Sequence, residues 1–194
     1  VLPEYYEKKS PVNPYVFMKK LFEGLEENDI VVTGNGSACV VSFQAAEIKK
    51  GQRLFTNSGC ASMGYGLPAA LGACIAEGEK RVICLDGDGS LMMNLQELQT
   101  IRYNNCNMKL FVLNNNGYHS IRQTQNNLFK NGLVGVCDGN GVNFPPFDKL
   151  ADTFGFRYFK IDSLDGIEEK LQEVLNTDGP VPVSYTHLTL PTKA

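Results

Sequence analysis

Two apolar runs joined by one expected helix constrain the fold of this chain more than any other feature. The run at 82–85 leads into the turn 86–90 (DGDGS), and the run at 108–113 leads into 114–117 (NNNG). Between them, Asn94 followed by Glu97 matches a variant capping box, and a helical stripe follows at Leu95, Leu98 and Ile101. In such a βαβ unit both strands end at the same edge of a parallel sheet, where these sheets bind ligands.

The ends of the two runs carry complementary oxygen ligands. Asp88 offers a carboxylate and Asn115 an amide oxygen, while Gly87, Gly89 and Gly117 let the backbone approach a ligand closely. One carboxylate with carbonyl oxygens is too little for a dedicated calcium site. It suits Mg²⁺ that also takes oxygens from the phosphate of a substrate or cofactor.

Two other interpretations of the first turn were weighed. DGDG alone is often a plain turn. An EF-hand would place Asp86, Asp88, Ser90 and Glu97 at positions 1, 3, 5 and 12. That pattern requires glycine at position 6, where this chain has Leu91, and a helix before the loop, where this chain has a predicted strand.

Gly87-Asp88-Gly89 followed by Asn114-Asn115 resembles the thiamine diphosphate motif, which opens with GDG and closes with NN. Asp88 and Asn115 are 27 positions apart, which fits that motif. The flanking residues resemble the acetolactate synthase branch of the family. The resemblance implies that the Asp88 carboxylate, the Asn115 side chain and the Gly117 carbonyl hold Mg²⁺ against the cofactor diphosphate.

Two earlier segments gain a role from this resemblance. The turn 34–38 is a candidate phosphate-binding turn at a helix N-terminus, although Cys39 replaces the third glycine of a dinucleotide fingerprint. In the segment 57–76, Met63 matches the large apolar residue that holds the cofactor bent, and ordinary core filling is the alternative. The residues expected to bind the cofactor are Gly36, Ser37, Ala61, Met63, Gly87, Asp88, Gly89, Ser90, Asn115, Gly117 and Tyr118. The expected metal ligands are Asp88, Asn115 and Gly117.

Two residues after the motif depart from acetolactate synthases. His119 stands where those enzymes usually have glycine, so it is either a histidine that bonds backbone or a donor to the substrate carboxylate or proton carrier. Thr124 stands where they have a tryptophan that lines the acceptor pocket. A wider, more polar acceptor pocket is one interpretation, and a Thr124 side chain that points away is the other.

The alternation of strand and helix continues along the chain. Asn13-Pro14 predicts a helix that runs to near Asn28, further strands are expected at 30–33 and 156–161, and further helices at 147–154 and 165–176. These elements predict an α/β fold with one parallel sheet covered by helices on both faces. We assign 1–12 to a linker from an upstream region and 13–183 to a single domain. Residues 184–194 are an atypical tail, either foreign to the domain or a divergent native terminus.

Composition narrows the classes of partner. The net charge of −3 gives no reason to expect nucleic acid or an anionic membrane as a partner. Six scattered cysteines without a CxxC pair, and only two histidines, argue against a zinc site. No apolar run has the length of a membrane span and no signal peptide is evident, so we expect a cytoplasmic protein.

The resemblance covers residues 13–183 and corresponds to the last third of a full enzyme. It implies a domain that forms a homodimer or homotetramer when the enzyme is complete, because a glutamate from another domain of the partner subunit completes the site. We therefore expect part of a 2-oxo acid decarboxylating carboligase of branched-chain amino acid biosynthesis, inactive alone. The alternatives are a 2-oxo acid decarboxylase without ligation and a fragment that only binds its ligand.

Overall fold

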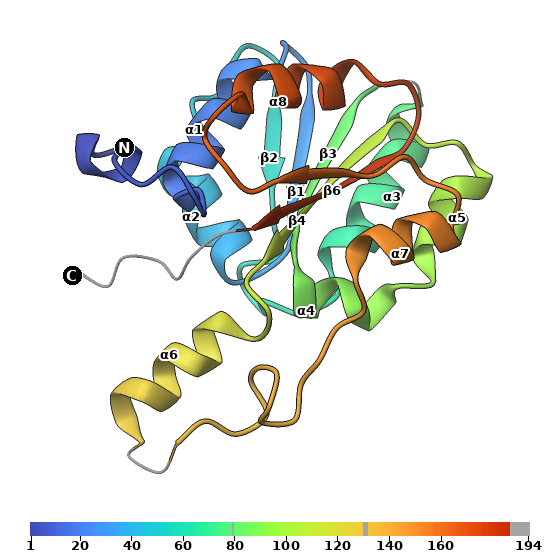
Figure 1. The fold of residues 1–194 in the computed structure, drawn as a ribbon. Coiled ribbons are helices and arrows are strands. Elements are labelled where there is room, and N and C mark those ends of the chain that lie inside the picture. Colours follow the sequence, from blue (N-terminus) through green and yellow to red (C-terminus); the bar gives the residue numbers. More distant parts are fainter. Residues whose placement is uncertain (79, 130–131, 187–194) are drawn as a thin grey trace.

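A single sheet of parallel strands forms the centre of the molecule. The computed structural model describes residues 1–78, 80–129 and 132–186. Within them, six strands pair in the order β2-β1-β3-β4-β6-β5, and every neighbouring pair is parallel (Figure 1). The strands are β1 (Ile30–Thr33), β2 (Arg53–Phe55), β3 (Val82–Gly87), β4 (Met108–Asn114), β5 (Phe159–Ile161) and β6 (Val181–Thr186). The predicted parallel sheet is confirmed.

Helices cover both faces of this sheet. On one face lie α1 (Pro14–Gly24), α2 (Ser37–Ala45) and α8 (Ile167–Asn176), and on the other lie α3 (Gly66–Glu77), α5 (Glu97–Tyr103) and α7 (Phe147–Thr153) (Figure 1). Strand β3 shows why both faces are needed, because Ile83 and Leu85 enter the first core while Val82 and Cys84 enter the second. All four are buried, as expected for a central parallel strand.

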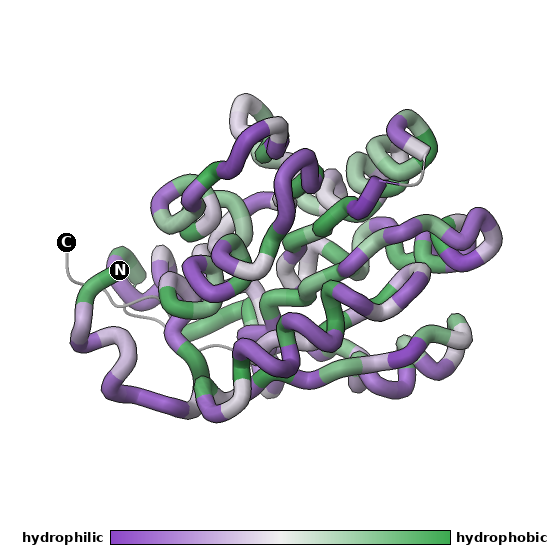
Figure 2. Tube along the Cα trace, turned by 90° about the horizontal axis from the view of Figure 1, so that it is seen from above, coloured by the Kyte–Doolittle hydropathy of each residue, from purple (hydrophilic) through white to green (hydrophobic). Residues whose placement is uncertain are grey.

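The remaining elements are short or lie at the rim. They are η1 (Pro3–Tyr6), α4 (Asp88–Leu91), η2 (Met92–Asn94) and α6 (His119–Leu128). Helix α6 and the chain after it extend away from the sheet in Figure 1. Figure 2 shows hydrophobic and hydrophilic segments alternating along the trace, as the succession of buried strands and exposed connections requires. Within the described ranges, no helix is long and apolar enough to cross a membrane.

Three local expectations were wrong. Asn94 does not cap α5, because its Nδ2 donates to the carbonyl oxygen of Gly64 at 2.7 Å, and α5 begins after Gln96 without a side-chain cap. Helix α1 ends at Gly24 and not near Asn28, because Leu25 takes an extended conformation. Strand β5 begins at Phe159, three residues later than expected.

The packed unit extends past both limits that we assigned to the domain. Val12 is fully buried, and its carbonyl oxygen accepts a hydrogen bond from the Tyr185 hydroxyl at 2.8 Å. Strand β6 continues to Thr186, so residues 184–186 complete a strand and do not belong to a separate tail. The rest of the expected tail, 187–194, lies outside the described residues.

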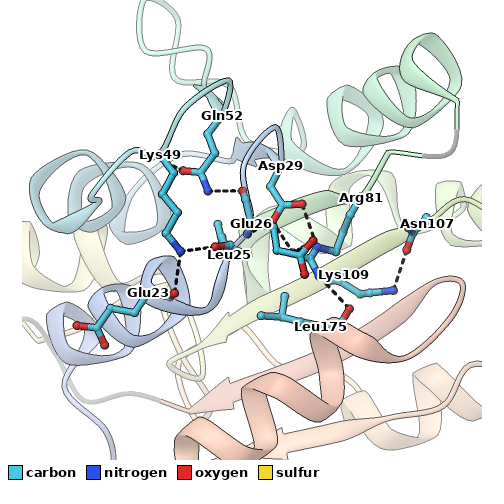
Figure 3. Close-up of polar contacts among 10 residues, drawn as sticks. All are labelled: Glu23, Leu25, Glu26, Asp29, Lys49, Gln52, Arg81, Asn107, Lys109 and Leu175. Atoms are coloured by element: carbon cyan, nitrogen blue, oxygen red, sulfur yellow. Dashed lines mark hydrogen bonds and ion pairs between the residues drawn. The ribbon is translucent and has the colours of Figure 1, made fainter.

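A polar cluster fastens the amino-terminal ends of the strands, opposite the predicted ligand edge. Arg81 donates from Nε and Nη2 to the two carboxylate oxygens of Asp29 at 3.0 and 2.5 Å, and from Nη1 to the carbonyl oxygen of Leu175 at 3.2 Å (Figure 3). Lys109, whose side chain is fully buried, donates to Asn107 Oδ1 at 2.9 Å. Arg81 therefore holds the end of α8 against the sheet, while Lys109 fastens the start of β4.

Candidate functional site

The predicted ligand edge lies at the point where the chain leaves neighbouring strands in opposite directions. After β1 the chain enters α2 on one face of the sheet, and after β3 it enters α4 and then α5 on the other. A crevice forms at such a point, outside the carboxyl ends of the strands, and is the usual ligand site of open α/β sheets. Here it lies between β1 and β3, with β4 beside them.

A cavity of about 160 Å³ occupies this position. Every residue that we expected to bind the cofactor lines it, with the exception of Ala61. Ala61 is exposed, and its carbonyl oxygen accepts a hydrogen bond from Asn35 Nδ2 at 3.1 Å, so it supports the wall from behind. The lining also includes residues that were not among the eleven expected to bind the cofactor: Asn35, Ala38, Leu113, Ser120 and Ile121.

Asp88 joins the two halves of the motif. Its side chain is buried, and its Oδ1 accepts a hydrogen bond from the Gly89 amide at 2.8 Å. Its Oδ2 accepts from the amides of Asn115 and Gly117, both at 3.0 Å. Burial raises the pKa of Asp88, while these backbone donors act in the opposite direction. The structure thus brings the three expected metal ligands into direct contact.

Arg122 holds the second expected ligand from the side of α6. Its Nη2 lies 3.1 Å from the Asn115 carbonyl oxygen and 3.4 Å from Asn115 Oδ1. Arg122 is one helical turn past the start of α6, so the helix and the ligand loop are joined by this side chain. The Asn115 amide is consequently oriented before any cation binds.

Two glycines of the motif have no room for a side chain. A Cβ atom on Gly89 would lie 2.2 Å from Tyr118 Cε1, and one on Gly117 would lie 2.0 Å from the Val136 carbonyl oxygen. Gly117 also has φ of +143°, where L side chains are rarely found. Close packing of the two loops therefore explains these glycines, together with ligand approach.

Asn35 ties the turn after β1 to the motif. Its Oδ1 accepts a hydrogen bond from the Ser90 hydroxyl at 2.7 Å, and its Nδ2 reaches Ala61. The sequence contained a signal for it, because Asn35 lies between the two glycines of a turn that we had already connected with phosphate binding. Helix α2 begins directly behind this turn at Ser37, without a side-chain cap, so its first amide groups lack helical partners.

Asp86 and Asp88 contact different groups, which argues against the EF-hand interpretation. Its carboxyl group is fully buried between Gly34 and Gly66, where a Cβ on either glycine would lie 2.1 or 2.7 Å from a carboxyl oxygen. The Gly87 amide donates to Asp86 Oδ1 at 2.9 Å, and burial raises the pKa of Asp86 to about 7. Asp86 therefore supports the loop from the α3 side and is no ligand of a shared cation.

The two residues that depart from acetolactate synthases lie in different surroundings. His119 is buried and lines the cavity, and burial together with the neighbouring Arg122 lowers the pKa of its imidazole. Thr124 is exposed, does not line the cavity, and donates its hydroxyl to the Ser120 carbonyl oxygen at 3.0 Å. Thr124 therefore lies outside the cavity that this chain forms, and its role in an acceptor pocket stays a prediction.

The donor set fits a diphosphate held through Mg²⁺. Mg²⁺ prefers one or two carboxylates and takes its remaining ligands from phosphate and water, which matches Asp88 with the Asn115 and Gly117 oxygens. The unsatisfied amides at the start of α2 suit phosphate oxygens. A dry cavity of ~150 Å³ holds one benzene ring. The cavity here is therefore large enough for a diphosphate and too small for a cofactor with two further rings.

The fold and this site define a domain that binds the diphosphate of a cofactor at the switch point of a parallel sheet. A family model described as "Thiamine pyrophosphate enzyme, C-terminal TPP binding domain" matches residues 34–185. The chain belongs to this family and is the C-terminal thiamine diphosphate-binding domain of an acetolactate synthase-like enzyme. The cofactors of such enzymes are thiamine diphosphate and Mg²⁺.

Curated relatives of the chain are acetolactate synthases. "Acetolactate synthase isozyme 1 large subunit" of Escherichia coli (strain K12) is 30% identical over 170 residues, which make up 88% of this chain and 30% of that protein. "Acetolactate synthase 1, chloroplastic" of Nicotiana tabacum is 32% identical over 173 residues, 87% of this chain and 26% of that protein. "Probable acetolactate synthase large subunit" of Methanococcus aeolicus is 30% identical over 180 residues, 90% and 30% respectively. The chain thus spans less than a third of the length of these relatives.

Proposed function

We propose that this chain is the diphosphate-binding part of a longer enzyme that decarboxylates a 2-oxo acid and joins the bound fragment to an acceptor. The observation that carries the proposal is the contact of Asp88 with the amides of Asn115 and Gly117. This contact turns two distant parts of the sequence into one oxygen-rich site. When bound, thiamine diphosphate supplies the electron sink that decarboxylation requires.

The residues of this chain bind and orient that cofactor. Asp88, the Asn115 side chain and the Gly117 carbonyl hold Mg²⁺, and the turn at Gly36 and Ser37 receives the diphosphate. Met63 lines the same cavity, where its flexible apolar side chain supports the cofactor. Because Asp88 is held by three backbone amides, its carboxylate is already directed toward the cation position. Such preorganisation lowers the cost of binding.

The small cavity supports the proposal that another part of the enzyme completes the site. A cavity of this volume has room for a diphosphate but not for the two rings as well, so Met63 can cover only part of the rings from this chain. We propose that the other walls around the rings come from the remaining two thirds of the enzyme, in a homodimer or homotetramer located in the cytoplasm. The isolated 194-residue chain should then release no CO₂ from pyruvate.

Simple decarboxylation without ligation is the alternative enzymatic activity. A module that binds its ligand without catalysis is the alternative that is not an enzyme. The relatives described above are named as acetolactate synthases, which favours ligation. A product assay with pyruvate on the complete enzyme separates the three. Acetolactate indicates ligation, acetaldehyde indicates plain decarboxylation, and the absence of both indicates a binding module.

The cation site is tested by calorimetric titration of the complete enzyme with thiamine diphosphate in the presence of MgCl₂. Loss of a group that merely orients a metal ligand weakens metal binding about 10–100-fold, so we expect Asp88→Ala to weaken cofactor binding at least this much. Asn115→Ala should weaken it strongly as well. Asp152→Ala, which removes an exposed carboxylate on α7, is the matched control. Equal affinity of Asp88→Ala and wild type would disprove the site.

A further inference from the structure

His119 is a buried histidine for which the described residues provide no hydrogen-bond partner. It is the first residue of α6, its side chain is 6% exposed, and it lines the cavity. Among the described residues, no group hydrogen-bonds its Nδ1 or its Nε2. Buried polar side chains in native proteins nearly always have a partner, so an imidazole in this state calls for an explanation. A histidine with a purely structural role would bond a backbone group.

The surroundings of His119 indicate what the missing partner is. Asp88, the one carboxylate among the described residues that line the cavity, already accepts three backbone amides. Arg122, one turn along the same helix, adds positive charge beside the imidazole and is itself directed to Asn115. Across the cavity, the start of α2 presents amide groups that lack helical partners. These groups are donors, so the complementary ligand atom is an anionic oxygen.

We propose that His119 donates a hydrogen bond to an anionic oxygen of the ligand that fills this cavity. This makes His119 a binding residue in addition to the GDG and NN motif. The inference rests on the proposed function, because that function supplies two candidate oxygens. One belongs to the cofactor diphosphate and the other to the carboxylate of the 2-oxo acid. Either one would give the imidazole a charged acceptor in a buried site, where such bonds are strong.

Two substitutions separate hydrogen bonding from ring packing. His119→Phe keeps a planar ring of similar size and removes both nitrogens, whereas His119→Gln keeps an N–H donor. Asn127→Ala changes an exposed residue on the same helix and is the matched control. The proposal predicts that the melting temperature of the ligand-free enzyme does not fall in His119→Phe, because no protein hydrogen bond is lost. A structural histidine would give a lower melting temperature in this variant.

Binding measurements on the complete enzyme identify the oxygen. Thiamine diphosphate with MgCl₂ is titrated first, and oxamate, an unreactive isostere of pyruvate, is then titrated into the loaded enzyme. If the diphosphate is the acceptor, His119→Phe raises the Kd of thiamine diphosphate about 10–100-fold and leaves oxamate affinity unchanged. If the substrate carboxylate is the acceptor, His119→Phe raises the Kd of oxamate and leaves the Kd of thiamine diphosphate unchanged. The KM for pyruvate then rises with the Kd of oxamate. In both cases His119→Gln retains most of the affinity.

The outcomes that overturn the proposal are equally distinct. Unchanged affinity for both ligands in His119→Phe would overturn it, and so would a fall in the melting temperature of that variant with equal loss in His119→Gln. Failure of the wild-type enzyme to bind thiamine diphosphate would overturn the proposed function itself. Wild-type binding that Asp88→Ala abolishes and His119→Phe leaves intact would overturn only the role of His119.

Discussion

Lys109→Met removes a buried ammonium group from the amino-terminal edge of the sheet. Besides Asn107, Lys109 Nζ donates to the carbonyl oxygens of Thr177 at 2.6 Å and Gly179 at 2.7 Å, which lie between α8 and β6. Burial, followed by the charge of Arg81, lowers the pKa of Lys109 from 10.5 to about 8. At pH 7 we expect the variant to be less stable by about 1–3 kcal/mol, because partly buried carbonyls lose their donor.

The difference in the free energy of unfolding between wild type and Lys109→Met should increase with pH. From about pH 8 to 10.5 the unfolded chain still holds a proton on Lys109 that the folded chain has released. The stability of the wild type therefore rises with pH in this window, relative to the variant. At 1.36 kcal/mol per pKa unit, the full difference is about 3 kcal/mol, and about 2.5 kcal/mol of it falls between pH 7 and 10. Solvent near the strand ends screens part of this, so we expect about 1–2 kcal/mol.

Urea unfolding of both proteins at pH 7 and pH 10 measures this change. Taking the difference between wild type and variant cancels the titration of all other groups. Lys49→Met provides the baseline, because exposed Lys49 also donates to two backbone carbonyls, those of Glu23 and Leu25 (Figure 3). A difference in the free energy of unfolding that stays constant or decreases between pH 7 and pH 10 would refute the reasoning.

Three further changes test the ligand edge. Gly89→Ala forces the Tyr118 ring aside, so we expect a stability loss of about 1–3 kcal/mol in urea unfolding and weaker binding of thiamine diphosphate in calorimetry. Gly34→Ala drives a Cβ into the buried carboxyl group of Asp86 and should lower the melting temperature more than Gly72→Ala, where the added Cβ has no neighbour within 4 Å. Thr124→Trp should leave the preference between pyruvate and 2-oxobutyrate unchanged in a competition assay with the complete enzyme, because Thr124 is exposed and lies outside the cavity; a shift toward 2-oxobutyrate would show that Thr124 lines the acceptor pocket of the complete enzyme.

The parts of the molecule that could be predicted are those that neighbouring residues in the sequence indicate by themselves. A short, mostly apolar run bounded by turn residues was sufficient for β1, β3 and β4, because both faces of these strands are covered. The two halves of the cofactor motif were equally visible, since they follow two of these strands. Strand β2 was missed because it has only three residues, one of them exposed.

The wrong predictions have causes that lie far away along the chain. Asn94 has the residue type of a helix cap but bonds the carbonyl oxygen of Gly64, thirty positions earlier, which no local pattern reveals. Asn35 is held at the site by hydrogen bonds with Ser90 and Ala61, which are again far away in the sequence. The contact across the assigned domain limits at 12 and 183 was hidden for the same reason, because the Tyr185 hydroxyl bonds the Val12 carbonyl oxygen from the opposite end of the chain.

The adjacency of β3 and β4 has a consequence for the order in which the molecule folds. Six residue pairs join these strands, and residues 88–107 connect them, so their loop closes at a lower entropic cost than the pairing of β4 with β6, which residues 115–180 connect. The two halves of the metal site follow directly after the carboxyl ends of these two strands. Folding that begins with the β3–β4 unit would therefore assemble the cation ligands before the outer strands join, and the wall contributed by the turn after β1 would close the cavity afterwards.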